Sequence, residues 1–140
     1  MMPEPIDLFT YDSRVIVSAG IRDQGSDFLI QFDDGSELIL IDNAQLCCEN
    51  RYVATDDDPN DLIGGRLLRI ILKGTGSEDK GYDCEDIQFV EVCTNQGSIV
   101  LNNYVVHNGY YGGWDLQILD DGKRRYVDPK RQAQFNRDGY

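Results

Sequence analysis

Side chains able to carry out acid–base or nucleophilic chemistry are scarce in this sequence. His107 is the single histidine of the 140-residue chain. No segment has the spacing of a serine nucleophile elbow, a phosphate-binding loop, a dinucleotide-binding glycine motif or a zinc-protease helix. Neighbouring carboxylates such as Glu85-Asp86 carry little information, because the chain has 25 acidic residues. We therefore expect no catalytic residues, and a protein that binds a partner rather than transforming it.

The candidate metal ligands lack the spacing that a metal site needs. Cys47 and Cys48 are adjacent, whereas two thiolates on one zinc ion are usually separated by two to four residues. The acidic run 56–61 resembles the start of a calcium loop, but Asp61 stands where that loop has glycine and Leu67 where it has a bidentate glutamate. We expect no metal and no cofactor, with a weak surface cation site at 56–61 as the alternative.

The segment 102–114 has the composition of a recognition surface. It combines three asparagines, three tyrosines, three glycines, the single histidine and the single tryptophan. Tyrosine and tryptophan offer large contact areas at low entropic cost, and their rings stack on nucleobases with about 1–3 kcal/mol per base. Asparagine and glycine adapt to polar ligands. The alternative is a glycine-rich turn whose aromatic side chains cover the sheet.

Arginines are rare in the acidic body of the chain and are candidates for holding phosphate. The planar guanidinium group suits phosphate geometry, and Arg66 follows Gly64-Gly65, where a ligand could approach the backbone closely. Ion pairing with neighbouring aspartates is the alternative. The candidate ligand-binding residues are Arg51, Arg66, Asn103, His107, Asn108, Tyr110, Tyr111 and Trp114.

The charge of the chain restricts its partners. The net charge is −12, and residues 120–140 carry 6 basic and 4 acidic side chains on an otherwise acidic body. Such a body repels nucleic acids and anionic membranes, so we expect neither as a direct partner. The acidity indicates solubility or, alternatively, mimicry of a nucleic-acid backbone. The basic tail contains three aromatic residues, which favours docking and a homo-oligomer.

The pattern of apolar residues predicts a mainly β protein, an antiparallel meander sheet or small barrel with one or two short helices. Asp27–Phe32 and Glu37–Ile41 flank an Asp-Gly turn and predict a hairpin. Ile87–Cys93 and Ser98–Val106 predict a second hairpin across Asn95-Gln96-Gly97. We expect helical turns at 44–48 and a loop over 74–85. The predicted organisation is an irregular segment 1–12, one β-rich domain over 13–119 and a basic tail over 120–140.

The compartment follows from the first residues and from the cysteines. The chain opens with Met-Met-Pro-Glu-Pro, without an apolar leader, and has no apolar run of the ~20 residues that span a bilayer. The four cysteines show no disulfide framework. A cytoplasmic protein with reduced thiols is expected.

Two boxes in the sequence resemble a known family. They are Leu46-Cys47-Cys48-Glu49 and Asn108-Gly109-Tyr110-Tyr111-Gly112-Gly113. The combination, over about residues 38–119, resembles an uncharacterised domain-of-unknown-function family common in bacteriophage genomes. The resemblance implies a small viral accessory protein in an infected bacterial cell.

Accessory proteins of this kind often disarm host immunity, which gives the leading hypothesis for function. We expect a non-enzymatic protein that sequesters a nucleotide-type immune signal. Arg51 or Arg66 would hold phosphate, Tyr110, Tyr111 and Trp114 would stack on the base, and Asn103 and Asn108 would contact polar edges. The alternatives are an acidic inhibitor of a host defence effector or nucleic-acid-handling protein, and a virion or assembly component.

Overall fold

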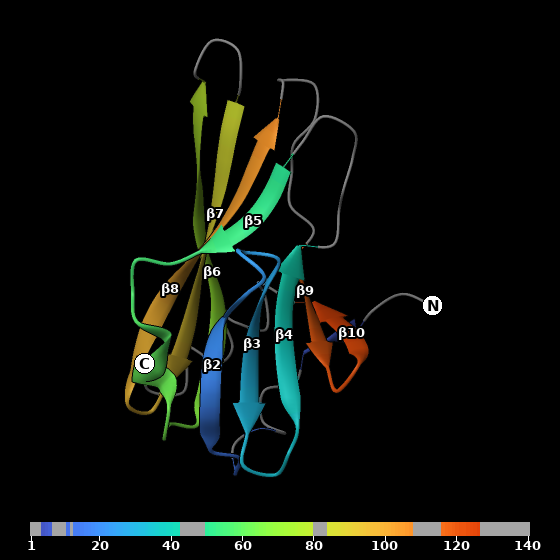
Figure 1. Ribbon diagram of the computed structural model, residues 1–140, viewed down its shortest axis with the longest axis vertical. Coiled ribbons are helices and arrows are strands. Elements are labelled where there is room, and N and C mark those ends of the chain that lie inside the picture. The colour runs from blue at the N-terminus through green and yellow to red at the C-terminus, as the bar shows by residue number, and fades with distance from the viewer. Residues whose placement is uncertain are drawn as a thin grey trace.

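The described part of the protein consists of two β-sheets with almost no helix (Figure 1). The computed structural model describes residues 4–6, 11, 13–42, 50–79, 84–107 and 116–126. The six-stranded sheet has the order β1 (Glu4–Pro5), β10 (Lys123–Tyr126), β9 (Leu116–Asp120), β4 (Glu37–Asp42), β3 (Asp27–Phe32) and β2 (Ile16–Arg22). The four-stranded sheet has the order β5 (Asn50–Ala54), β8 (Gly97–His107), β7 (Cys84–Thr94) and β6 (Leu67–Asp79).

The prediction of a mainly β protein is confirmed. β3 and β4 pair across the Asp33–Ser36 turn, and β7 and β8 pair in register from Cys84↔His107 to Thr94↔Gly97. The strands form two separate sheets and not a closed barrel. In the described part of the chain, helical structure is limited to Tyr11 and the 3-10 turn η2 (Pro59–Leu62), and the helical turns predicted at 44–48 lie outside the described residues.

The predicted loop over 74–85 is wrong, because β6 continues to Asp79 and β7 begins at Cys84. Gly74, Gly76 and Ser77 are poor strand formers by themselves. Here the partner strand overrides that preference. The ring of Phe89 lies 3.9 Å from the place where a Cβ of Gly76 would be, and Ser77 Oγ donates a hydrogen bond of 2.5 Å to Asp86 Oδ1. A bulge between Leu72 and Gly74 accommodates the change of register.

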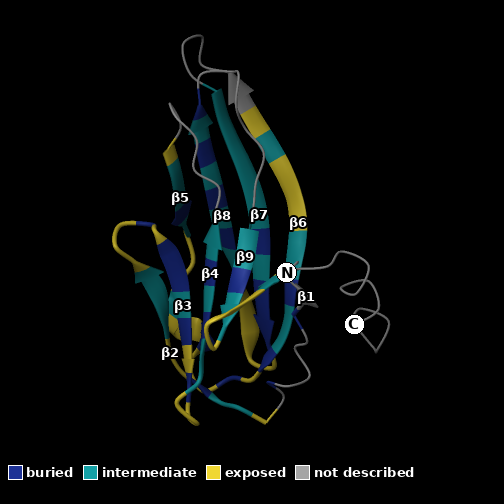
Figure 2. Cartoon of the chain, turned by 90° about the vertical axis from the view of Figure 1, so that its right-hand side faces the viewer, coloured by how far each residue is buried: buried dark blue, intermediate teal, exposed yellow. Residues whose placement is uncertain are grey.

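The core lies between the inner faces of the two sheets. Strand residues alternate between faces, so every second residue of β8 from Ile99 onward is buried. The fully buried side chains include Tyr11, Ile16, Phe28, Ile30, Leu38, Leu40, Leu62, Leu67, Ile70, Ile99, Leu101 and Ile118. β6 is exposed over much of its second half (Figure 2). No helix in the part of the chain that the structure describes is long and apolar enough to cross a membrane.

The two sheets are also joined through a backbone contact at a turn. Val53 N–H in β5 donates a hydrogen bond of 2.8 Å to Gly25 O, in the turn between β2 and β3. Gly25 has φ +110°, and a Cβ at this position would lie 2.9 Å from Val53 O. The turn approaches β5 this closely because residue 25 has no side chain.

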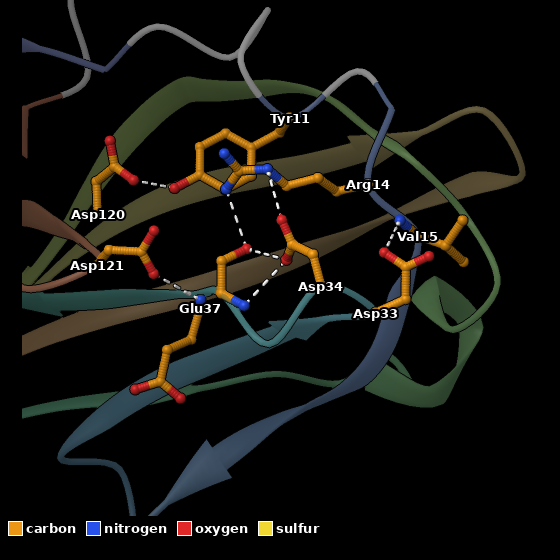
Figure 3. Close-up of polar contacts among 9 residues, drawn as sticks. Tyr11, Arg14, Val15, Asp33, Asp34, Glu37, Asp120 and Asp121 are labelled. Carbon is orange, nitrogen blue, oxygen red and sulfur yellow. Dashed lines mark hydrogen bonds and ion pairs between the residues drawn. The ribbon is translucent and has the colours of Figure 1, made fainter.

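A polar network fixes the chain before β2 to the β3–β4 hairpin (Figure 3). The Tyr11 hydroxyl donates a hydrogen bond to Asp120, and burial raises the pKa of Tyr11 far above its usual value. Arg14 lies over the Tyr11 ring, 4.3 Å from its centroid, and pairs with Asp34 at 3.2 Å. The hydrogen bonds from Ser36 lower the pKa of Asp34. These side chains serve as hydrogen-bond and ion-pair partners for one another, so we assign the network a structural role.

Candidate functional site

The inner face of the four-stranded sheet changes from apolar to polar along its length. β6, β7 and β8 extend past the ends of β4 and β9 (Figure 1). Ile99 and Leu101 of β8 belong to the core, but Asn103 and His107 follow them on the same face and are also buried. We call the polar side chains gathered here the polar cluster. It consists of Asp42, Arg51, Ser77, Asp86, Gln88, Asn103 and His107.

An ion pair between the sheets forms one half of the polar cluster. Asp42 is the last residue of β4, and Arg51 is the second residue of β5. Arg51 Nη1 lies 3.0 Å from both carboxylate oxygens of Asp42. The two side chains are only 4% and 3% exposed. Taking two charges out of water costs several kcal/mol per ion, so a buried pair is weak evidence of a stabilising role.

Asn103 joins the ion pair to the neighbouring strand. Its Nδ2 donates hydrogen bonds to Asp42 Oδ2 at 3.0 Å and to Gln88 Oε1 at 3.3 Å. Both partners are acceptors, which fixes the orientation of the amide because a flipped amide would set oxygen against oxygen. Asn103 Oδ1 is buried and has no hydrogen-bond partner among the described residues. The polar cluster therefore presents one open acceptor inside the protein.

The second half of the polar cluster is built around Asp86. Its Oδ2 lies 2.7 Å from His107 Nε2, and its Oδ1 accepts the hydrogen bond of Ser77. The His107 side chain is 7% exposed and that of Asp86 17%. Cys84 is the cross-strand partner of His107. The carboxylate thus orients the imidazole ring.

The polar cluster combines acidic and basic side chains. Two carboxylates, Asp42 and Asp86, face one guanidinium group and one histidine. Arg51 is already held by Asp42, so an incoming phosphate would have to displace a buried carboxylate. The cluster is better suited to a neutral, hydrogen-bonding group than to an anion.

Three of the predicted ligand-binding residues meet in the polar cluster: Arg51, Asn103 and His107. Arg66 lies apart from them, exposed beside Leu67, which pairs with Thr94 at the opposite end of the sheet. Its backbone N–H donates to Asn95 Oδ1 at 2.8 Å. The other predicted residues, Asn108, Tyr110, Tyr111 and Trp114, lie outside the described residues.

Four members of the polar cluster were not identified from the sequence: Asp42, Ser77, Asp86 and Gln88. Asp86 and Gln88 alternate with Ile87 and Phe89, and in the sequence this alternation predicts that the polar side chains face solvent and the apolar ones the core. The partner of Asp42 depends on how two sheets pack. Such contacts carry no local sequence signal.

The opposite face of the same sheet carries a second candidate site. Tyr52 and Tyr104 stack there, with centroids 4.8 Å apart and planes inclined by 16°. Beside them lies a shallow pocket of about 290 Å³, which we call the outer pocket. It is lined by Asp56, Asp57, Phe89, Val100 and Asn102.

A metal centre is not apparent in the described ranges. No three His, Cys, Asp or Glu side chains there could hold a metal ion together. Cys93 is a free thiol, and burial raises its pKa to about 11, with a further contribution from Glu91. Cys47 and Cys48 lie outside the described part of the chain.

The fold and the site define a two-sheet, mainly antiparallel β protein with a largely buried polar cluster. Residues 13–116 match the model of the family described as Domain of unknown function (DUF7448), and the chain belongs to this family. The matched range contains every member of the polar cluster. No curated protein and no solved structure matches the chain.

Proposed function

We propose that the protein is a non-enzymatic binding protein that holds the base of a nucleotide-type molecule in the polar cluster. The observation that carries this proposal is the buried, unpaired Oδ1 of Asn103. A buried acceptor without a donor costs about 1–3 kcal/mol. A ligand that donates a hydrogen bond to this atom would remove the cost.

The donor and acceptor pattern favours a nucleobase edge. Asn103 and Gln88 face each other across β7 and β8, and side-chain amides pair with the donor–acceptor edges of bases. Because Arg51 is neutralised by Asp42, the phosphate groups would point away from the polar cluster. This differs from the expectation that Arg51 itself holds phosphate.

The chain connectivity supplies aromatic residues for stacking. The segment 108–115 directly follows His107, so Tyr110, Tyr111 and Trp114 are within a few residues of the polar cluster in sequence. Aromatic rings add about 1–3 kcal/mol per stacked base. Sequestration by such a site needs no catalytic group. We extend the proposal to a cytoplasmic bacteriophage protein that withdraws a nucleotide immune signal, on the strength of the two boxes that resemble phage sequences.

A thermal-shift screen with mono-, di- and cyclic nucleotides and the corresponding nucleosides tests the proposal. A ligand at 100 times its Kd stabilises the native state by about 2.7 kcal/mol. We expect stabilisation by particular bases, retained in the nucleoside, and recovery of the ligand chemically unchanged. Asn103→Leu should abolish the response, whereas Asn102→Leu, the neighbouring position on the opposite face, should retain it. Absence of any response, or an equal response in Asn103→Leu, would refute the proposal.

A second candidate function is inhibition of a host protein that handles nucleic acids. It is favoured by the exposed carboxylates of Asp56, Asp57, Asp58 and Asp61 beside η2. An inhibitor of this kind should ignore nucleotides and lose its partner steeply as salt rises, because exposed charges are screened.

A further inference from the structure

The outer pocket is held in shape by its own hydrogen bonds. β5 ends at Ala54, and the residues that follow it form hydrogen bonds to the part of the β8 edge beyond β5. Thr55 Oγ1 donates to Val100 O at 2.7 Å, and Val100 N–H donates to Asp57 Oδ2 at 2.7 Å. Asp57 N–H in turn donates to Thr55 Oγ1 at 3.1 Å. The loop therefore sets the carboxylates of Asp56 and Asp57 at the rim of an apolar floor.

The floor of the outer pocket continues into an apolar sheet face. Phe89 and Val100 line it, and Phe89 pairs with Asn102 across the strands. The next row along the sheet holds Tyr104, which stacks on Tyr52. These side chains are all partly exposed, on the face turned away from the six-stranded sheet. An apolar floor with an acidic rim suits a basic side chain that is flanked by aromatic residues.

The chain itself contains a segment of this chemistry. Residues 127–140 carry three basic and two acidic side chains, with Lys130-Arg131 adjacent, and also contain Phe135 and Tyr140. We propose that this segment of one copy binds the outer pocket of a second copy and so joins the chains into a homo-oligomer. The inference does not depend on nucleotide binding.

The position of β10 favours a second copy over the same chain. β10 pairs with β9 and β1 in the six-stranded sheet and ends at Tyr126. The outer pocket lies on the far side of the four-stranded sheet, so the segment would have to pass around the edge of its own molecule to reach it. A neighbouring copy placed against this face could present its segment to the outer pocket directly, which is the arrangement we propose.

Light scattering of the full chain and of a chain ending at Tyr126 tests the proposal. We expect an oligomer that becomes a monomer on truncation. A labelled peptide of residues 127–140 should bind the truncated protein, and Asp56→Asn should weaken this binding about two- to fivefold, as expected for loss of one exposed ion pair. Lys130→Gln in the peptide should have a similar effect.

Asp23→Asn is the matched control, because it removes one exposed carboxylate from a turn of the other sheet. Its peptide affinity should equal that of the parent protein. Equal masses of the full and truncated chains would overturn the proposal. If the full chain is a monomer and the truncated chain nevertheless binds the peptide, the segment binds the pocket of its own chain, which also overturns it. An Asp56→Asn variant with unchanged peptide affinity would overturn the pocket assignment.

Discussion

Asp42 and Arg51 form an ion pair across the gap between two sheets, with Nη1–Oδ distances of 3.0 Å and both side chains almost fully buried. The two residues lie on strands that are consecutive in the chain but belong to different sheets. Asn103 contacts the same carboxylate from β8. The pair therefore marks the point where the apolar core ends and the polar cluster begins.

Removing one partner of this pair should destabilise the protein strongly. Arg51→Met leaves the carboxylate of Asp42 buried without its cation, for which we expect a loss of about 3–5 kcal/mol in the free energy of unfolding. Urea denaturation measures it. The control is Lys73→Gln, which removes a more exposed pair with Glu91 and should cost about 1 kcal/mol or less. Equal losses in the two variants would contradict the assigned burial.

Gly25→Ala should destabilise the protein more than Gly35→Ala. Both glycines have positive φ, at +110° and +87°, so both variants strain the backbone by about 1–3 kcal/mol. Only at Gly25 does the new Cβ also meet Val53 O at 2.9 Å, since nothing lies within 4 Å at Gly35. Thermal and urea unfolding of both variants give the comparison. A smaller loss of stability in Gly25→Ala would mean that the β2–β3 turn does not contact β5 at Val53.

Stability should fall at high pH because of Tyr11. Burial, followed by the hydrogen bond to Asp120, raises the pKa of Tyr11 in the folded state, whereas the unfolded chain ionises near pH 10. Below pH 10 both states are protonated and the stabilisation is complete. Above it the unfolded state loses the proton first, so the free energy of unfolding falls by up to about 1.4 kcal/mol per pH unit. Tyr11→Phe should show a shallower decline between pH 9 and 11, and an unchanged slope would contradict this assignment.

The Cys93 thiol should resist alkylation in the folded protein. Burial raises its pKa to about 11, so almost no thiolate is present at pH 8, and the side chain is inaccessible. Iodoacetamide treatment followed by mass spectrometry of peptides should find Cys93 unmodified in the native protein and modified in urea. Cys84, which is partly exposed, is the internal comparison. Modification of Cys93 at the same native rate as Cys84 would show that β7 is not packed as described.

The individual strands and hairpins could be predicted from the sequence because their signals are local. The Asp-Gly turn and the alternation of Phe28, Ile30 and Phe32 are sufficient for the β3–β4 hairpin. The second half of β6 could not be predicted. Its glycines and polar residues have low strand propensity, and its structure depends on pairing with β7.

The candidate site was predictable in residue type but not in arrangement. Arg51, Asn103 and His107 were candidates because each could bind a ligand, and strand pairing brings them to one inner face. Asp42 could not be identified in advance, because its contacts to Arg51 and Asn103 depend on how β4 packs against the other sheet. Arg66 was selected on the same grounds as Arg51, but it lies at the opposite end of the sheet.

The most direct test of the proposed function is an NMR titration of the protein with the base or nucleotide that stabilises it most. His107 is the single histidine, so its imidazole signals are identified without ambiguity, and the Asn103 side-chain amide can be assigned by substitution. We predict that saturation with ligand shifts the Asn103 amide and His107 imidazole signals, while the amide of Asn102 on the opposite face stays in place. Ligand binding that shifts Asn102 and leaves Asn103 and His107 unchanged would contradict the placement of the ligand in the polar cluster.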